Sequence, residues 1–206
     1  MGHYELAYRL APGDPNIISA YAQSLRYVNR VREAVPLAEE AVVLDPLNPV
    51  SFVRQGEVLF FARRYDEAIA ALKRGLALNP GNKPSLSTLG DTLVLTGKPR
   101  EALAAYAGVP SDWDRLRGEA IAAYRLGDRL SAERKLADLK AIDDGSLNYQ
   151  FAEIYAAWGQ REQALASLAA ADRADDPGLS TLPVDPFLDP LRSDPRFQAL
   201  VKKRGV

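Results

Sequence analysis

Few residues in this sequence belong to the types that carry out catalysis or bind metals. There is no cysteine, which excludes disulfides, thiolate chemistry and cysteine-based zinc sites. The single histidine, His3, stands at the start of the chain, where we interpret it as a terminal residue rather than a catalytic base or a metal ligand. No glycine-rich phosphate-binding loop occurs either. We therefore expect no enzymatic activity, no cofactor and no metal site.

Two acidic clusters and one basic run remain as candidates for ion binding. The clusters lie at 143–144 and 172–176, and neither has the ligand spacing of a calcium-binding loop. Helix caps and solvated turns explain both clusters. The basic run at 202–204 complements the dipole at the carboxyl end of a predicted last helix. We favour these structural interpretations over a calcium site or a phosphate site.

The overall composition limits the partners that this chain can have. Its 206 residues include 26 basic and 27 acidic side chains, so there is no basic excess of the kind that binds nucleic acid. No run approaches the about 18 apolar residues that a membrane-spanning helix needs. We expect a soluble protein with a sizeable core, because 47% of its residues are apolar. The lack of cysteine fits the cytoplasm and the periplasm alike, and we favour the cytoplasm.

A proline-marked corner recurs along the chain. The segments LAPGDP, LDPLNP and LNPGNK begin at residues 10, 44 and 78, so they are 34 residues apart. Asp14 and Asn48 are good helix N-caps, and a proline follows each at the first helical position, where its missing N–H costs nothing. The earlier proline of each corner stops the preceding helix, because the residue before a proline avoids the α conformation. Each corner is therefore predicted to end one helix and to start the next.

A small residue recurs with a similar period. An alanine returns at intervals of 34, 34, 30 and 32 residues, as Ala34, Ala68, Ala102, Ala132 and Ala164. Bulky residues spaced at i, i+3, i+4 and i+7 predict an amphipathic helix before each alanine, and a second helix follows. The small residues let the two helices of a pair approach closely. We predict five units, at 15–48, 49–82, 83–112, 113–144 and 145–176.

The third unit is irregular. It is four residues short, which is about one helical turn. Gly108 and Pro110 are predicted to end its second helix early, and Trp113 opens the next unit. We interpret Trp113 as filling the space beside the truncated helix. The alternative is that Trp113 lies in the wall of a ligand cleft.

The repeat resembles the tetratricopeptide repeat (TPR) family over roughly residues 4–176. The family pattern has small residues at positions 8 and 20 and bulky residues at positions 4, 7, 11 and 24, with a closing proline. Position 8 is held here by Ala22, Gly56 and Gly90. The resemblance implies an all-α fold, which is a right-handed α-solenoid of antiparallel helix pairs. It also implies a role in binding other proteins.

In that family the first helix of each unit lines a concave groove, mainly through positions 2, 5, 9, 12 and 13. These positions include Arg26 and Glu153 in this chain. Our candidate residues for binding a protein or peptide on this face are Gln23, Tyr27, Val53, Glu57, Phe60, Phe61, Ser87, Asp91, Val94, Leu95, Arg117 and Tyr124. Phe60 and Phe61 either offer an apolar surface to a partner helix or pack between helices, and the sequence leaves both possibilities open.

Some members of the family hold a partner's terminal carboxylate in a clamp of lysine, asparagine and arginine side chains. The residues at the clamp positions of this chain are Ser19, Gln23, Arg54, Pro84 and Thr88. Since only one of these is basic, the resemblance implies that such a clamp is absent.

The two ends of the chain depart from the repeat. Residues 1–14 match the second helix of a truncated repeat. Residues 177–206 form a proline-rich tail, in which Asp194 is predicted to cap a last helix at about 195–203. A solenoid needs a cap over its last open apolar edge, and this tail can provide one.

Three functions follow as hypotheses. The main one is a scaffold, in a larger bacterial protein, that binds a peptide or a helix segment in its concave groove. The tail also resembles the closing segment of bacterial TPR proteins fused to a class III adenylate cyclase or a winged-helix regulator. That resemblance implies an alternative, a regulatory or sensor domain that binds its own missing N-terminal domain. The third hypothesis is a self-assembly module, a weak homo-oligomer that pairs through the open edge near Tyr4 and Tyr8.

Overall fold

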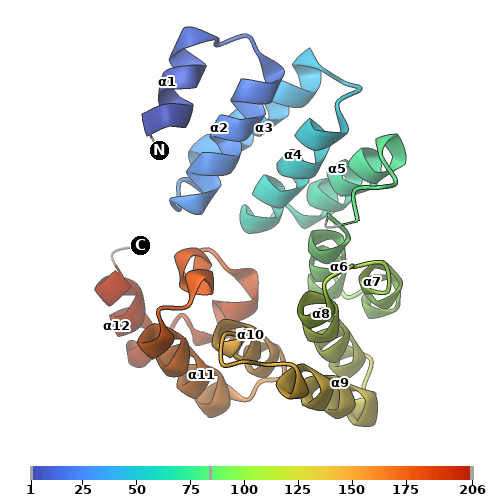
Figure 1. Cartoon of the computed structure of the whole chain (residues 1–206), viewed down its shortest axis with the longest axis vertical. Coiled ribbons are helices and arrows are strands. Elements are labelled where there is room, and N and C mark those ends of the chain that lie inside the picture. The colour runs from blue at the N-terminus through green and yellow to red at the C-terminus, as the bar shows by residue number, and fades with distance from the viewer. Residues whose placement is uncertain (1, 84, 205–206) are drawn as a thin grey trace.

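The computed structural model describes residues 2–83 and 85–204, and within these ranges it contains helices and no β-strand (Figure 1). A single helix, α1 (Gly2–Leu10), comes first. Five helix pairs follow: α2 (Pro15–Tyr27) with α3 (Val31–Leu44), α4 (Pro49–Phe61) with α5 (Tyr65–Leu78), α6 (Ser85–Leu95) with α7 (Pro99–Tyr106), α8 (Asp112–Arg125) with α9 (Arg129–Ala141), and α10 (Asn148–Ala157) with α11 (Arg161–Ala174). The tail has two short 3₁₀ segments and a last helix: η1 (Pro177–Thr181), η2 (Pro186–Leu191) and α12 (Pro195–Arg204).

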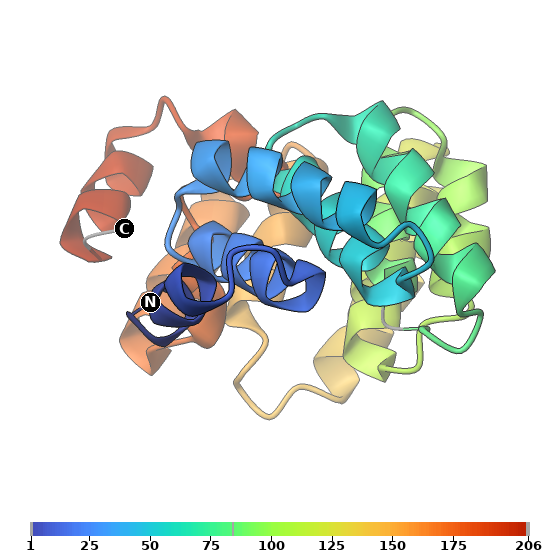
Figure 2. The ribbon, with the colours of Figure 1, turned by 90° about the horizontal axis from the view of Figure 1, so that it is seen from above.

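The pairs are stacked along a curve. The two helices of each pair pack on each other, and the first helices α2, α4, α6, α8 and α10 also contact one another in turn. Figure 1 shows the curve running from α1 through the pairs to α12, with its open side between the two ends of the chain. The view from above in Figure 2 places the last helix beside the open side as well. This arrangement confirms the predicted all-α solenoid.

The proline-marked corners start and stop helices as predicted. The Asp14 side chain accepts hydrogen bonds from the backbone N–H groups of Asn16 and Ile17, and Pro15 takes the first helical position. Asn48 does the same for α4, with a distance of 3.0 Å from its Oδ1 to the Val50 nitrogen. The preceding helices α1 and α3 end two residues before the first proline of each corner. Both predicted N-caps are confirmed.

A second kind of turn joins the two helices within each pair. Each of these turns contains one residue with a positive φ angle: Asn29 (61°), Arg63 (61°), Gly97 (74°), Gly127 (83°) and Gly159 (75°). Their spacing is that of the recurring alanines, because each turn occupies the same place in its pair. Glycine adopts this conformation at little cost, whereas a side chain makes it less favourable. Arg63 is therefore an unusual choice, and its side chain extends from the turn to the tail.

The close approach of helices depends on small residues, as expected. Tyr106 of α7 is fully buried, and its ring lies between two glycines of neighbouring helices, Gly90 of α6 and Gly118 of α8. A Cβ atom on Gly90 would lie 2.5 Å from the Tyr106 ring, and one on Gly118 would lie 2.1 Å from it. Either distance is far below van der Waals contact. These two glycines therefore make the room for the tyrosine.

The third pair has the short second helix that the sequence predicts, since α7 ends at Tyr106. The interpretation of Trp113 as the filler of the space beside it is wrong. Trp113 is 41% exposed on α8. Val109, by contrast, is buried in the central core, which is the apolar cluster formed by residues of α4 to α10 and by Phe187. Leu86 takes the position next to Gly108, where an added Cβ would lie 2.6 Å from its Cδ1 atom.

The tail covers the last helix pair. Leu182, Leu188 and Leu191 are at most 1% exposed, and they pack with Phe197 against the apolar faces of α10 and α11. Asp194 caps α12, because its Oδ1 accepts a hydrogen bond from the Arg196 backbone N–H at 2.8 Å. The predicted capping helix and its N-cap are thus present.

The tail also does something that the sequence analysis did not anticipate, because it returns across the concave side to α4. Arg63 donates a hydrogen bond of 2.6 Å to the Asp189 carboxylate and one of 3.1 Å to the Val184 carbonyl. Phe187 is buried in the central core together with residues of α4, α6, α8 and α10. The tail is therefore one wall of the concave side.

Candidate functional site

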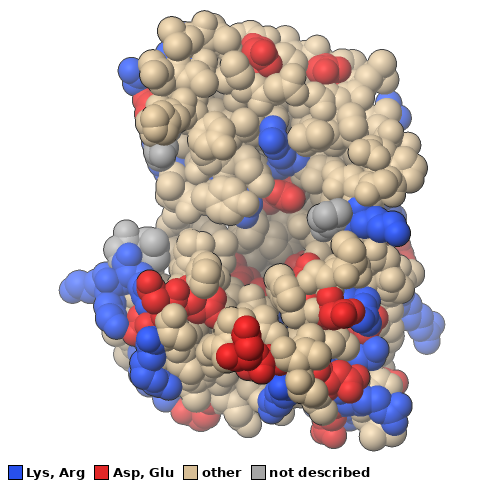
Figure 3. Space-filling model, viewed as in Figure 1, with Lys and Arg blue, Asp and Glu red and all other residues tan. Residues whose placement is uncertain are grey.

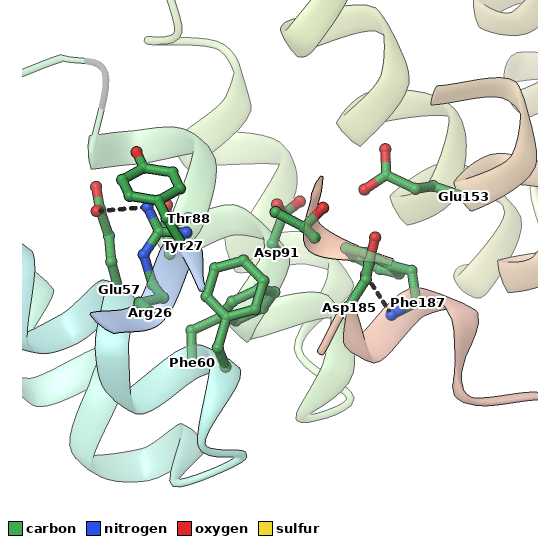
Figure 4. Close-up of a pocket in the computed structure, with 11 residues that line it drawn as sticks. Arg26, Tyr27, Glu57, Phe60, Thr88, Asp91, Glu153, Asp185 and Phe187 are labelled. Carbon is green, nitrogen blue, oxygen red and sulfur yellow. Dashed lines mark hydrogen bonds and ion pairs between the residues drawn. The ribbon is translucent and has the colours of Figure 1, made fainter. Parts of the chain in front are cut away.

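A cavity of about 220 Å³ lies on the concave side, between the first helices and the tail (Figure 4). Its lining residues are Arg26 and Tyr27 of α2, Glu57, Phe60 and Phe61 of α4, Thr88 and Asp91 of α6, Glu153 of α10, and Thr181, Asp185 and Phe187 of the tail. The space-filling view shows a hollow between the upper and lower halves of the molecule, with acidic groups at its walls (Figure 3). The cavity thus combines aromatic rings with carboxyl groups.

One wall of the cavity is organised by Arg117 of α8, which is 4% exposed. Its Nη2 atom lies 2.9 Å from Asp91 Oδ2 and 3.0 Å from Asp114 Oδ1, and its Nη1 atom lies 3.5 Å from Glu153 Oε1. Tyr106 donates a further hydrogen bond of 2.6 Å to Asp91. A single guanidinium thus serves three carboxyl groups, which come from three different helices.

The opposite wall is built by the tail. The Asp185 carboxylate accepts hydrogen bonds of 2.8 Å from the Tyr149 hydroxyl and from the Phe187 backbone N–H. Asp185 is 3% exposed, and Glu153 points toward the same space from α10 (Figure 4). The Phe187 ring lies below Arg117, with 5.7 Å between the guanidinium carbon and the ring centroid. Two helices and the tail therefore bring Asp91, Glu153 and Asp185 around one space.

The pKa values of these three carboxyl groups are raised. Burial raises the pKa of Asp91, and the charge of Arg117 opposes that shift. Burial raises the pKa of Glu153 well above its ordinary value, and the charges of Asp185 and Asp91 add to the effect against Arg117. Burial also raises the pKa of Asp185, although the hydrogen bond from Tyr149 counteracts it. All three pKa values shift in the same direction, because one buried guanidinium cannot offset the burial and mutual repulsion of the surrounding carboxylates.

The same excess of carboxyl groups also shifts the pKa of Arg117. Burial alone lowers the pKa of a guanidinium, since it disfavours the charged form. The surrounding charges of Asp91, Glu153 and Asp114 outweigh burial, and the pKa of Arg117 is raised well above its ordinary value. Arg117 is therefore a permanent cation in a strongly negative environment.

The rim of the cavity is aromatic. The Arg26 guanidinium carbon lies 4.0 Å from the Tyr27 ring centroid and 4.8 Å from that of Phe61. Arg26 also lies 3.8 Å from Glu57 Oε2, and Gln23 donates a hydrogen bond to the same oxygen. Tyr27 is 53% exposed, so its ring forms the accessible edge of the cavity. The rim thus holds a guanidinium between rings and a carboxylate.

The predicted binding residues fall into three groups. The cavity is lined by Tyr27, Glu57, Phe60, Phe61 and Asp91. Three more lie directly behind it in the polar network and are Gln23, Ser87 and Arg117. The other four lie elsewhere in the fold and are Val53, Val94, Leu95 and Tyr124.

The residues outside the cavity have clear structural roles. Val53 and Val94 are buried in the central core, and Leu95 packs against it. Tyr124 stacks on Trp158 with 4.9 Å between ring centroids, and its hydroxyl donates to the Trp158 carbonyl. The repeat positions of these four residues predicted which face of the helix they lie on. They did not predict that other side chains of the fold pack over that face.

The structure shows the packing role of the Phe60 and Phe61 pair, and contact with a partner helix stays a prediction. Phe60 is 4% exposed and belongs to the central core, and Phe61 is partly buried with its ring 5.0 Å from the Phe60 ring. Both rings nevertheless line the cavity. They pack between helices and present an edge to the cavity at once.

Four lining residues lie outside the groove positions of the repeat. Thr88 is one position away from those carried over, and Thr181, Asp185 and Phe187 belong to the tail. The Asp-Pro-Phe sequence at 185–187 signals a rigid segment with a large ring. Nothing in the sequence says that this segment returns to the first helices, so the tail wall could not be predicted.

Among the clamp positions, Ser19 is buried and accepts a hydrogen bond of 2.9 Å from Arg54. Pro84 lies outside the described residues. Within the described part of the chain, no group of three or more histidine, aspartate or glutamate residues is arranged to hold a metal ion. Over the same residues, each helix is too short or too polar to cross a membrane.

Comparisons with known proteins agree with the repeat. The family model described as "Tetratricopeptide repeat" matches residues 59–113. YrrB, a TPR protein with an unusual peptide-binding site, is similar in structure at 22% sequence identity, with a TM-score of 0.57 over 86% of this chain and 95% of YrrB. No curated protein sequence matches the chain.

Two further structures extend the likeness. TTC0263, a thermophilic TPR protein of Thermus thermophilus, shares 19% identity with a TM-score of 0.64 over 84% of this chain and 98% of its own. A TPR protein of Parabacteroides merdae shares 16% identity with a TM-score of 0.65 over 98% of this chain and 83% of its own. At these identities the likeness establishes the fold.

Proposed function

We propose that this chain, of which residues 59–113 match the tetratricopeptide repeat family, is a non-catalytic scaffold that binds a peptide or a helix segment of a partner on its concave side. The observation that carries this proposal is the cavity of about 220 Å³, which lies between the first helices and the tail. Concave sites with aromatic walls and a few polar groups are the usual form of recognition sites.

The properties of the rim support a segment of protein as the ligand. Tyr27 offers a half-exposed ring, and Phe61 offers a partly buried one on the neighbouring helix. The Arg26 guanidinium lies against both rings. A side chain of a partner can therefore pack on the exposed part of the Tyr27 ring, while the rest of its segment follows the first helices. The described peptide-binding site of the structurally similar YrrB is consistent with this use of the fold.

The tail limits how the partner can lie. The tail segment with Asp185 and Phe187 is buried on the concave side, where it packs on α10 and places Phe187 next to Arg117 of α8. A long helix therefore cannot occupy the full length of the curve. The partner segment is therefore expected to contact α2, α4 and α6 and to reach the cavity with one or two side chains.

A selection experiment tests the proposal. A library of random 12-residue peptides is displayed and selected on the immobilised chain, and the enriched peptides are measured by fluorescence anisotropy. We expect Tyr27→Ala to weaken binding at least tenfold, because it removes the accessible ring of the rim. The matched control is Leu130→Ala, which removes an exposed side chain from the outer helix α9. If no peptide is enriched, or if both variants bind as the wild type does, the proposal fails.

Self-assembly is a second candidate, favoured by exposed apolar side chains of α1. Tyr4, Leu6 and Leu10 are 51%, 55% and 77% exposed, and they lie at the first edge of the solenoid. Stacking of a second copy on this edge would bury them. We expect Leu10→Asp to abolish any rise of molar mass with concentration in light scattering. A mass that stays at that of the monomer for the wild type would exclude this candidate.

A further inference from the structure

The cavity and its surroundings carry more negative groups than positive ones. The carboxyl groups in or directly behind the cavity come from every element around it except α2 and are Glu57 of α4, Asp91 of α6, Asp114 of α8, Glu153 of α10 and Asp185 of the tail. Among the described residues, the ion pairs of these carboxyl groups involve two cations, Arg26 of α2 and Arg117 of α8. This part of the structure therefore leaves the cavity with an unbalanced negative potential.

The titration behaviour of the cavity agrees with this imbalance. The pKa values of Asp91, Glu153 and Asp185 are all raised, and burial is the largest cause for each. A positive group placed among them would favour their ionised forms, so they would stabilise it in return. The low polarity of a buried site strengthens such an interaction relative to water.

The chain already holds two guanidinium groups by the same combination of ring and carboxylate. Arg26 lies over Tyr27 and Phe61 at the rim and next to Glu57. Arg117 lies over Phe187 at the inner wall and bonds to Asp91. The space between these two arginines is lined by further rings and carboxyl groups of the same kinds. It is an environment suited to a third guanidinium.

We propose that the cavity is a recognition pocket for an arginine side chain of the partner segment. This inference rests on the proposed function and names the chemistry that the partner brings. Arginine suits the pocket better than lysine, because its planar guanidinium stacks on aromatic rings and bonds to carboxylates through two parallel N–H groups. Glu153 and Asp185 on one side and the Phe60 and Phe61 rings on the other supply these contacts.

The test uses a small guanidinium probe and so does not depend on finding the partner. Nα-acetyl-L-arginine amide is titrated into the ¹⁵N-labelled chain at neutral pH and low salt, and amide shifts are followed by NMR. Nα-acetyl-L-citrulline amide serves as the uncharged isostere, and Nα-acetyl-L-lysine amide serves as the alternative cation. Low salt is used because screening weakens a charge-dependent interaction.

We expect saturable shifts at the amides of Arg26, Glu57 and Glu153 with the arginine probe, and at least fivefold weaker binding of the citrulline and lysine probes. Glu153→Gln should abolish the shifts, since it removes a charge without changing the size of the side chain. The control Glu133→Gln, at an exposed position of α9, should leave them unchanged. The folded state of both variants is checked by circular dichroism.

In this titration, three results would overturn the inference: no saturable shift at these amides, equal binding of the citrulline or lysine probe, or an unchanged titration of Glu153→Gln.

The peptide selection separates this inference from the proposed function. Selected peptides that bind the concave side without an essential arginine leave the proposed function standing and contradict the arginine pocket. Agmatine is measured in the same titration as a small guanidinium compound that is not part of a peptide. If agmatine binds more tightly than every arginine-containing peptide, the result contradicts a peptide as the source of the guanidinium.

Discussion

The contact between Tyr106 and Gly118 makes a quantitative prediction about how the repeats pack. A methyl group at position 118 would place its carbon 2.1 Å from Cε1 and 2.4 Å from Cδ1 of the Tyr106 ring. The ring has little room to move, because Gly90 of α6 approaches the same ring atoms and the hydroxyl is bonded to Asp91 at 2.6 Å. We therefore expect Gly118→Ala to force a shift of α8 against α7.

The magnitude follows from two opposing effects. Overpacking of a dense core costs about 1–3 kcal/mol. Replacing glycine by alanine inside a helix gains up to about 1 kcal/mol through the backbone. A contact of 2.1 Å places the overpacking cost in the upper part of its range, at about 2–3 kcal/mol. The net loss of unfolding free energy is then about 1–2 kcal/mol, which corresponds to a fall in Tm of about 2–8 °C for a chain of this size.

The assay is thermal unfolding followed by circular dichroism at 222 nm. The matched control is Gly13→Ala, whose added Cβ would have no neighbour within 4 Å and which should change stability by less than about 0.5 kcal/mol. In a Tyr106→Leu background the same Gly118→Ala change should cost less, because the ring that it meets is gone. A Gly118→Ala variant that is as stable as the wild type, or more stable, would refute this packing argument.

Two further predictions concern a helix cap and the cavity. Asn48→Ala removes the side-chain bonds to the first turn of α4 and should cost about 1 kcal/mol in urea unfolding, whereas Asn48→Asp keeps the cap and should cost little; equal losses would contradict the capping role. Glu153 has a raised pKa in the folded chain, so the folded state binds more protons than the unfolded state above about pH 4, and unfolding free energy falls as pH rises through that range. Glu153→Gln should therefore raise Tm relative to the wild type at pH 8 and lose this advantage near pH 4, and a constant difference across this range would contradict the shift.

The local features of this chain could be predicted from its sequence because each depends on neighbouring residues. The caps at Asp14 and Asn48 follow from one side chain and the proline after it. The small residue at Gly90 follows from the spacing of the repeat, which fixes the helix face that meets the next helix. Short-range geometry of this kind is visible in a sequence.

The candidate site was predictable only in part, because its remaining walls depend on contacts between distant segments. The repeat positions placed Tyr27 and Glu57 on the concave face, and both residues line the cavity. They could not identify Asp185 or Phe187, because the contact between Arg63 and Asp189 joins residues 126 positions apart. A tail that covers the last helix pair has many possible directions, and only tertiary packing selects this one.

The charge of the site was likewise hidden in the sequence. The net charge of the whole chain is −1, which gives no sign of an acidic cavity. The imbalance arises because the fold gathers Asp91, Glu153 and Asp185 from three segments and buries them beside Arg117. Composition averages over the surface, whereas recognition depends on what one cavity collects.

The central claim, that a partner segment binds on the concave side, is tested most directly by photo-crosslinking. The photoreactive residue p-benzoylphenylalanine is introduced in place of Tyr27 at the rim of the cavity, or in place of Leu130 on the outer helix α9, and each protein is irradiated with a selected peptide. The account predicts a crosslinked product at position 27 and none at position 130, because only the first position adjoins the cavity. Crosslinking at position 130, or none at position 27 while the peptide still binds, would contradict it.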